Sequence, residues 1–173
     1  MELAIAPPSR VAAGVAFHTP LVVTFSSPKP TTDGKEENRE TVVLPDMSGV
    51  WAFVSLTTPD MQQSLAPPRA DLLRGKTADS IHPIHQEQEG ERSTIAYATF
   101  PGLKITQPGQ YRIKVNIIDM NASPTENAGE GAGLVLPSLH SQIFDVVEGS
   151  EHGIYGPEVA ETLSLLRSIG VDC

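Results

Sequence analysis

The apolar residues of this chain alternate with polar ones or form short runs, a pattern that is typical of β-strands. Residues 21–25 are apolar and rich in β-branched side chains, and prolines bound them on both sides. Residues 50–56 form a second apolar run of strand length, which contains the single Trp. Two further strand-like segments, residues 93–100 and 103–105, flank a Pro-Gly turn. We therefore expect a mostly β protein.

The clearest predicted strand covers residues 111–118. Its faces alternate, with Tyr111, Ile113, Val115 and Ile117 on one side and Arg112, Lys114 and Asn116 on the other. Residues 107–110 (Q-P-G-Q) before it have the signature of a type II turn. A Tyr directly after such a turn resembles the tyrosine corner of immunoglobulin-like sandwiches, and the alternative is an ordinary core tyrosine. Residues 140–148 are predicted to form the last strand.

The pattern changes to a helical period after residue 156. One face of the predicted helix carries Val159, Thr162, Leu163, Leu166 and Ile169. Pro157 suits the first helical position and Gly170 suits the position after the helix end. We therefore expect one short C-terminal helix that packs on the β core.

The length of 173 residues corresponds to a single domain covering residues 1–173. Prolines, glycines and charged residues gather near residues 26–41, 57–93 and 121–133, where we expect flexible loops, with at most one short strand in the second. Short strands separated by long loops make a β-sandwich likelier than a barrel, and a tyrosine corner at Tyr111 would place it among the immunoglobulin-like sandwiches. The predicted fold class is therefore mostly β, an immunoglobulin-like sandwich with a short C-terminal helix.

Charge limits the partners that the chain can bind. There are 12 Lys and Arg against 21 Asp and Glu, a net charge of −9, so bulk charge does not favour nucleic acid or anionic membranes. The acidity is uneven, because residues 1–114 hold 11 basic and 12 acidic side chains whereas residues 115–173 hold 1 and 9. The N-terminal part is therefore nearly neutral, and nucleic-acid binding there stays open.

Candidate chemistry is sparse. The single cysteine, Cys173, is the last residue, which excludes an internal disulfide and disfavours thiol catalysis. His82 and His85, with two nearby glutamates, are interpreted as a solvated loop because Pro83 prevents helical presentation of metal ligands. We therefore expect no enzyme activity, catalytic residue, metal or cofactor. The first residues lack the basic region of a signal peptide, and no apolar run reaches the ~20 residues of a membrane span, so we expect an intracellular protein without membrane attachment.

The basic residues of the first half form two groups. Arg10, Lys29, Lys35 and Arg39 flank the first strand, and Arg69, Arg74 and Lys76 lie in the long middle segment. Each group is either a solvated surface or a set of cations on loops at one end of a sandwich, where such loops contact DNA.

Several segments, in order along nearly the whole chain, resemble the velvet family of fungal regulatory proteins. The most specific are residues 97–105 (Y-A-T-F-P-G-L-K-I) and 109–115 (G-Q-Y-R-I-K-V), similar to the family's aromatic-F-x-D-L-S-V…G-x-Y-R-L core. The others are residues 3–14, 18–25, 73–75, 141–146 and 161–171, which are similar to the family's opening segment, first core strand, L-x-G motif, last strand and closing helix.

This resemblance implies a Rel-like immunoglobulin sandwich and a regulator of fungal development and secondary metabolism. It implies binding to DNA and to other velvet proteins as a homo- or heterodimer, and a nuclear and cytoplasmic location. By position, Arg10 matches a basic residue of the family's N-terminal DNA-contact segment. The predicted DNA-binding residues are Arg10, Lys29, Lys35 and Arg39.

The chain also departs from the family pattern. Residues 17–20 (F-H-T-P) stand where the family often has Asp-Arg-Arg-Pro, so two cationic side chains are replaced. One alternative is therefore an adaptor of the same fold that has lost direct DNA binding. A second alternative is a small-molecule binder or an enzyme that reuses the sandwich.

Overall fold

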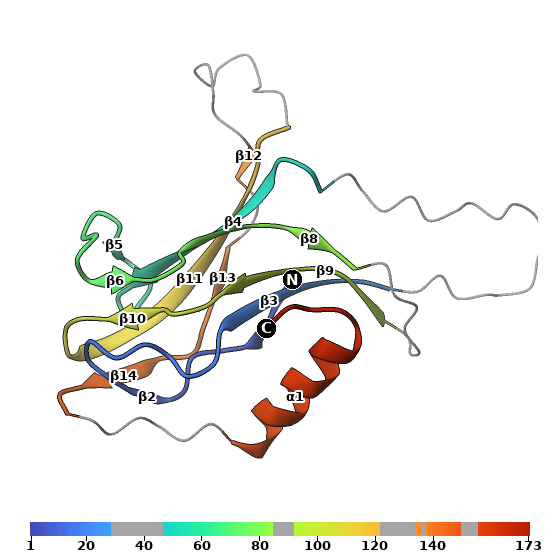
Figure 1. The fold of residues 1–173 in the computed structure, drawn as a ribbon. Coiled ribbons are helices and arrows are strands. Elements are labelled where there is room, and N and C mark those ends of the chain that lie inside the picture. The colour runs from blue at the N-terminus through green and yellow to red at the C-terminus, as the bar shows by residue number, and fades with distance from the viewer. Residues whose placement is uncertain (29–46, 85–91, 122–133, 136–137, 150–155) are drawn as a thin grey trace, which may run out of the picture.

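The computed structural model describes residues 1–28, 47–84, 92–121, 134–135, 138–149 and 156–173 (Figure 1). The first strands are β1 (Glu2–Ile5), β2 (Arg10–Ala12), β3 (Leu21–Pro28), β4 (Val50–Thr57), β5 (Ser64–Ala66), β6 (Leu73–Arg74) and β7 (Ala78–Ser80). The remaining elements are β8 (His82–Pro83), β9 (Arg92–Phe100), β10 (Lys104–Ile105), β11 (Gly109–Asp119), β12 (Leu134–Val135), β13 (Leu139–His140), β14 (Phe144–Val147) and the helix α1 (Pro157–Ser168). The protein is thus mostly β with one C-terminal helix, as predicted.

The strands form two main sheets and one short ribbon. The small sheet has the order β1-β3-β9-β8, and the large sheet has the order β2-β14-β11-β4-β5, with β12 and β13 also on β11 and β7 also on β4. The ribbon is the antiparallel pair β6–β10. Only β2 and β14, among the strands described, pair in parallel. Both sheets contribute side chains to one hydrophobic core, which includes Val23, Phe100, Val54, Leu56, Ile113 and Val115.

The alternation predicted for β11 is confirmed. Tyr111, Ile113, Val115 and Ile117 are buried, whereas the residues between them are half-buried. The partner strand β4 alternates over residues 50–54 and is buried throughout residues 54–57, and its Val54 lies opposite Val115 in the antiparallel register. Facing residues of the two strands therefore enter the core together, which fixes the centre of the large sheet.

The predicted C-terminal helix is also confirmed. Leu166 is only 4% exposed and packs with Val22 and Tyr97 on the outer face of the small sheet. Gly170 follows the helix end with a φ of 92°, and the Val171 N–H donates to the Leu166 carbonyl at 3.0 Å. This geometry is a Schellman motif, which needs a left-handed residue where the sequence supplies glycine. Among the residues described, no helix has the length and apolar character for a membrane span.

The prediction of a flexible loop near residues 57–93 is wrong for its described part. It contains β5, β6, β7 and β8, and β9 begins at its end. These strands have two or three residues each, too short to show an alternating pattern, and they form because long-range partners on β4, β9 and β10 are available. Residues 26–28 belong to β3, and the rest of the predicted loops near 26–41 and 121–133, apart from Asn121, lies outside the described residues.

Two other boundaries differ from the prediction. The strands β1 and β2 were not predicted, because they are short edge segments separated by two prolines. The strand predicted over residues 140–148 is instead the separate strands β13 and β14. Between them, the Ser141 hydroxyl accepts a hydrogen bond from the Ile113 N–H at 3.0 Å, so a side chain interrupts the ladder.

Tyr111 has the hydrogen bond expected of a tyrosine corner. Its hydroxyl donates to the Gln107 carbonyl at 3.1 Å, and its ring is buried near Phe144. The type II turn predicted before it is wrong, because Gly109 has a φ of 154°, far from the about 80° that such a turn requires, and already belongs to β11. The glycine is nonetheless restricted, since a Cβ there would lie 3.0 Å from the Tyr111 hydroxyl oxygen.

The burial of Leu166 yields a test of how the helix is held. Leu166→Ala is expected to lower the free energy of unfolding by about 2–4 kcal/mol, because it removes a buried side chain and leaves a cavity. The matched control is Leu165→Ala on the same helix, where the side chain is 64% exposed and the expected change is below about 0.5 kcal/mol. Urea denaturation of the full chain measures both, and equal losses would contradict the packing described.

Candidate functional site

Arg10 is the predicted DNA-contact residue that the structure describes. It begins the edge strand β2, and its side chain is exposed. Asp145 lies opposite it in the parallel register with β14, but the Asp145 carboxylate accepts a hydrogen bond from Gln110 at 3.0 Å. The Arg10 guanidinium forms no ion pair with a carboxylate of the described residues. Arg10 is therefore available for an external anion.

The other three predicted DNA-binding residues, Lys29, Lys35 and Arg39, lie outside the described residues, so their role stays a prediction. The strand before them, β3, starts opposite Phe100 and ends with Pro28 opposite Arg92. Phe100 lies beside the β9–β10 turn, so β3 runs away from that turn and ends at Pro28. Cations that the structure does describe gather at the end of the molecule that holds the turn.

Three segments converge at this end of the sheets: residues 13–20, 67–76 and 101–110. We call these segments the basic end. They contain four cationic side chains, Arg69, Arg74, Lys76 and Lys104, and one carboxylate, Asp71. Figure 1 shows β6 and β10, the strands of this end, together at the left. Sequence reasoning noted the cations at 69, 74 and 76 but missed Lys104, because its pairing with β6 joins residues about thirty positions apart in the chain.

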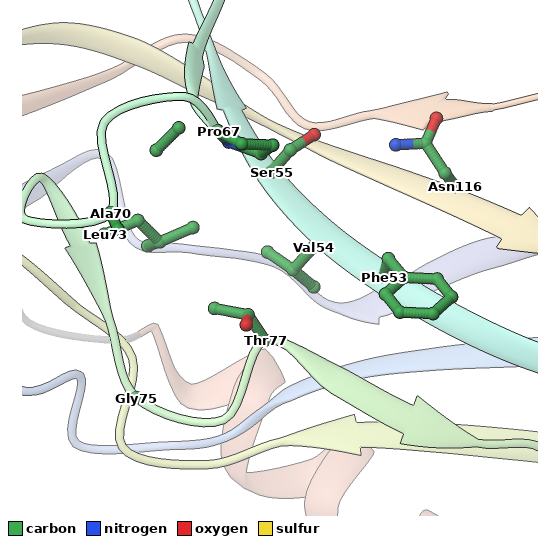
Figure 2. A pocket seen from close by; sticks show the side chains of 10 residues that line it. Phe53, Val54, Ser55, Pro67, Ala70, Leu73, Gly75, Thr77 and Asn116 are labelled. Carbon is green, nitrogen blue, oxygen red and sulfur yellow. The ribbon is translucent and has the colours of Figure 1, made fainter.

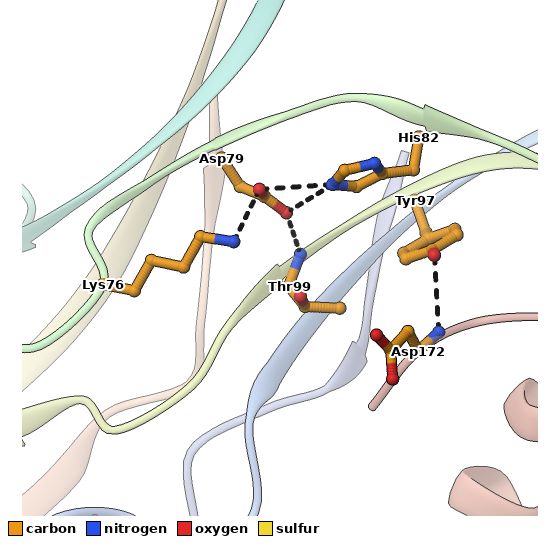
Figure 3. A network of polar contacts seen from close by, with 6 residues as sticks. All are labelled: Lys76, Asp79, His82, Tyr97, Thr99 and Asp172. Carbon is orange, nitrogen blue, oxygen red and sulfur yellow. Dashed lines mark hydrogen bonds and ion pairs between the residues drawn. The ribbon is translucent and has the colours of Figure 1, made fainter.

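The most buried charged group described is Asp79 on β7, which is 5% exposed (Figure 3). Its carboxylate accepts hydrogen bonds from Lys76 Nζ at 2.7 Å and from the Thr99 N–H at 2.8 Å. His82 Nε2 lies 3.2 Å from both carboxylate oxygens. Because Thr99 belongs to β9 and β7 pairs with β4, this one side chain joins the small sheet to the large sheet.

The protonation of Asp79 follows from these contacts. Burial raises the pKa of the carboxyl, but the hydrogen bonds from Lys76, from the Thr99 N–H and from His82 outweigh burial and bring the pKa below its usual 3.8. Asp79 is therefore ionised near neutral pH and holds Lys76 by a charge-assisted hydrogen bond. The Lys76 ammonium is consequently paired with Asp79 and is not a free cation.

The interpretation of residues 82–85 as a solvated loop is wrong for the described residues. His82 and Pro83 form β8, and the His82 ring lies 5.2 Å from the Tyr97 ring. Ile84 is buried next to Tyr97, whose hydroxyl accepts a hydrogen bond from the Asp172 N–H at 3.4 Å (Figure 3). His85, Glu87 and Glu89 lie outside the described residues. Within the described part, no group of three His, Cys, Asp or Glu residues could hold a metal ion.

A groove of about 530 Å³ lies on the outer face of β4 (Figure 2). Phe53 and Asn116 line it from β4 and β11, Pro67 lines it from the segment before β6, and Leu73 lines it from β6 itself. The groove offers apolar contact with a few hydroxyl and amide groups. One of those groups is engaged, because the Ser55 hydroxyl donates to the Lys114 carbonyl at 3.4 Å.

Two aromatic side chains next to this groove face solvent. Trp51 is 41% exposed and Phe53 is 36% exposed, and both point to the outer side of β4 because they alternate with the buried Ala52. Ile118 of β11 lies opposite Trp51 in the register. We call Trp51, Phe53 and Ile118 the aromatic face. The alternation of residues 50–56 could have predicted this face, since every second side chain of a strand points away from the core.

Comparison of the chain with known proteins finds no match among the protein-family models and none among the curated proteins.

The contacts of Asp79 predict how stability depends on pH. Asp79→Asn is expected to lower the free energy of unfolding at pH 7 by about 1–3 kcal/mol, because it removes the charge-assisted hydrogen bonds of a buried group. The pKa of Asp79 is lowered on folding, so its contribution is present above the unfolded value of about 3.8 and is lost as the pH falls through the folded value.

The measurement is urea denaturation of wild type and variant at pH 7 and at stepwise lower pH. The difference between the two proteins should narrow on acidification. Asp71→Asn is the control, because the Asp71 side chain is exposed and its ion pair with Arg69 spans 3.6 Å. A constant difference across the pH range would contradict the assignment of the effect to the ionised carboxylate.

Proposed function

We propose that this chain is a velvet-type transcriptional regulator that binds DNA as a homo- or heterodimer with another velvet protein. Its role would be the control of fungal development and secondary metabolism, and its location nuclear and cytoplasmic. The basis is the ordered resemblance of its segments to the velvet family, together with an arrangement of strands and cations that suits the proposal.

The finer fold assignment, an immunoglobulin-like and Rel-like sandwich over residues 1–173, is part of the same proposal. Three features support it: both main sheets contribute to one core, the Tyr111 hydroxyl makes the corner hydrogen bond, and α1 follows the last strand. In this fold, loops and edge strands at one end of a rigid core present side chains to a partner.

The observation that carries the DNA-binding proposal is the placement of Arg10. It is exposed on an edge strand and forms no ion pair with the described carboxylates. A guanidinium of this kind matches the geometry of a phosphate oxygen pair. The family resemblance assigns the same residue to the N-terminal DNA-contact segment.

DNA binding by the isolated chain can be measured by fluorescence anisotropy with a labelled duplex between about 50 and 200 mM salt. Wild type is expected to bind with an affinity that falls steeply with salt, because phosphate contacts release counterions. Arg10→Gln is expected to weaken binding and to reduce the slope of log K against log salt by about 0.9, the loss of one phosphate contact.

The control for this measurement is Lys114→Gln, which removes one positive charge from the outer side of β11 and should leave affinity unchanged. An unchanged affinity of Arg10→Gln would remove the residue assignment. No binding by wild type at the lowest salt would contradict direct DNA binding by this chain alone.

The alternative function, an interaction module without direct DNA binding, is favoured by one observation of its own, the aromatic face. Exposed aromatic side chains beside an apolar groove are typical of protein–protein contact surfaces. The occupant that we consider is a second copy of this chain, which would bury the same three side chains across a two-fold axis.

Dimerisation through the aromatic face is testable by analytical ultracentrifugation. Trp51→Ser/Phe53→Ser is expected to shift a dimer toward monomer while thermal unfolding changes little, because both side chains are partly solvated in the single chain. Leu165→Ser, another exposed apolar position, is the control and should leave the dimer intact. Identical association of the double variant and wild type would exclude this surface as the interface.

A further inference from the structure

The β6–β10 ribbon places two like charges directly opposite each other. In its antiparallel register, Ile105 faces Leu73 and Lys104 faces Arg74. Ile105 and Leu73 are buried in the main core, whereas Arg74 is exposed and Lys104 is half-buried. The ribbon therefore has one pair that anchors it and one cationic pair next to it.

This cationic pair opposes folding. Directly opposed like charges on an antiparallel pair are destabilising, because their Cβ atoms lie only about 5 Å apart. Among the described residues, no carboxylate forms an ion pair with either Arg74 or Lys104. A local arrangement that works against stability without a compensating contact is typical of a functional site.

The ribbon is held in place by backbone hydrogen bonds on both sides. The Thr106 N–H donates to the Leu72 carbonyl at 3.0 Å, and the Lys76 N–H donates to the Pro101 carbonyl at 3.3 Å. Gly75 approaches the other turn so closely that a Cβ there would collide with the carbonyl oxygen of Gly102. The two cations are therefore presented by a fixed backbone and not by a free chain end.

Arg74 and Lys104 are the two cations of the basic end that have no carboxylate partner among the described residues. Asp71 is the one carboxylate of its three segments, and it pairs with Arg69. Lys76 is held by Asp79. Arg74 and Lys104 thus concentrate positive charge at one point of a chain whose net charge is −9.

We propose that Arg74 and Lys104 form a phosphate-contacting site for the backbone of double-stranded DNA, additional to Arg10. This inference rests on the proposed DNA binding and gives it a second point of contact. The Arg74 guanidinium supplies a planar pair of donors for phosphate oxygens, and the Lys104 ammonium supplies a compact charge beside it.

The path of the chain connects the two contact points. Four residues after Arg10, the Gly14 N–H donates to the Ile105 carbonyl at 2.7 Å. The Phe17 N–H then donates to the Leu103 carbonyl at 2.8 Å, so the segment after β2 runs along β10. One duplex that passes this end can consequently meet the exposed Arg10 and the cationic pair together.

The test compares Arg74→Gln/Lys104→Gln with wild type in duplex binding by fluorescence anisotropy. The double variant is expected to bind about tenfold or more weakly at about 50 mM salt, and its salt slope should fall by about two, the loss of two phosphate contacts. The matched control is Lys114→Gln/Arg167→Gln, which changes the net charge equally on α1 and on the outer side of β11. Its affinity should stay near that of wild type.

Thermal unfolding separates a binding role from a structural one. The midpoint of Arg74→Gln/Lys104→Gln should equal or exceed that of wild type, because the repulsion is relieved. Lys104→Glu is sharper, since a carboxylate opposite Arg74 should raise the midpoint while it weakens DNA binding.

Three outcomes would overturn the inference. Wild-type affinity in Arg74→Gln/Lys104→Gln would do so and would leave the proposed function standing. A midpoint below that of wild type in both variants would assign the pair a structural role. Failure of wild type to bind duplex DNA at any salt would remove the proposed function and this site together.

Discussion

One buried carboxylate links the two sheets, which also share a hydrophobic core. Asp79 lies on a strand of the large sheet and accepts the Thr99 N–H of the small sheet at 2.8 Å. The strand β8 pairs with Ala96 and Tyr97 but does not reach Thr99. The Asp79 side chain therefore accepts the hydrogen bond from the Thr99 N–H instead of a β8 backbone carbonyl. A buried carboxylate is stable only when its lone pairs are satisfied, and Lys76 and His82 supply the remaining donors. The same set of Asp79 contacts thus links the two sheets, keeps the carboxylate ionised and holds His82 of β8 in place.

These contacts also determine which cations remain for a partner. Asp79 engages Lys76 and Asp71 pairs with Arg69, so the cations of the basic end divide into neutralised and unneutralised ones. The repulsion between Arg74 and Lys104 is small compared with what the adjacent buried pair, Leu73 and Ile105, contributes, because a fully buried aliphatic side chain stabilises by about 1.5–3 kcal/mol. The core therefore holds an unfavourable surface pair in a fixed register.

Sequence periodicity predicted the elements whose patterns are long enough to read. Alternation over β11 and a helical face ending at Gly170 are local signals, and both were confirmed. Strands of two or three residues carry no period, and their existence depends on partners far away in the chain, so β5 to β8 were missed. The candidate site divides in the same way. Arg10 was predicted from the resemblance of residues 3–14 to a family segment, and its role stays a prediction. The contacts of Asp79 and the Arg74–Lys104 pair depend on strand register, which no single segment of the sequence specifies.

An acidic net charge is compatible with the proposed DNA binding, because charges close to a bound phosphate act on it more strongly than distant ones. Residues 115–173 hold 9 of the 21 Asp and Glu side chains but only 1 basic one, and two of these acidic residues, Glu158 and Glu161, lie on α1, which Figure 1 places across the small sheet and away from the β6–β10 ribbon. At about 0.1 M ionic strength the screening length is about 10 Å, so remote carboxylates would repel a duplex bound as proposed only weakly. Cations in direct contact with phosphates are screened much less. The acidity of α1 would disfavour approach of DNA from the side of the helix, so the uneven placement of charge would orient the proposed complex.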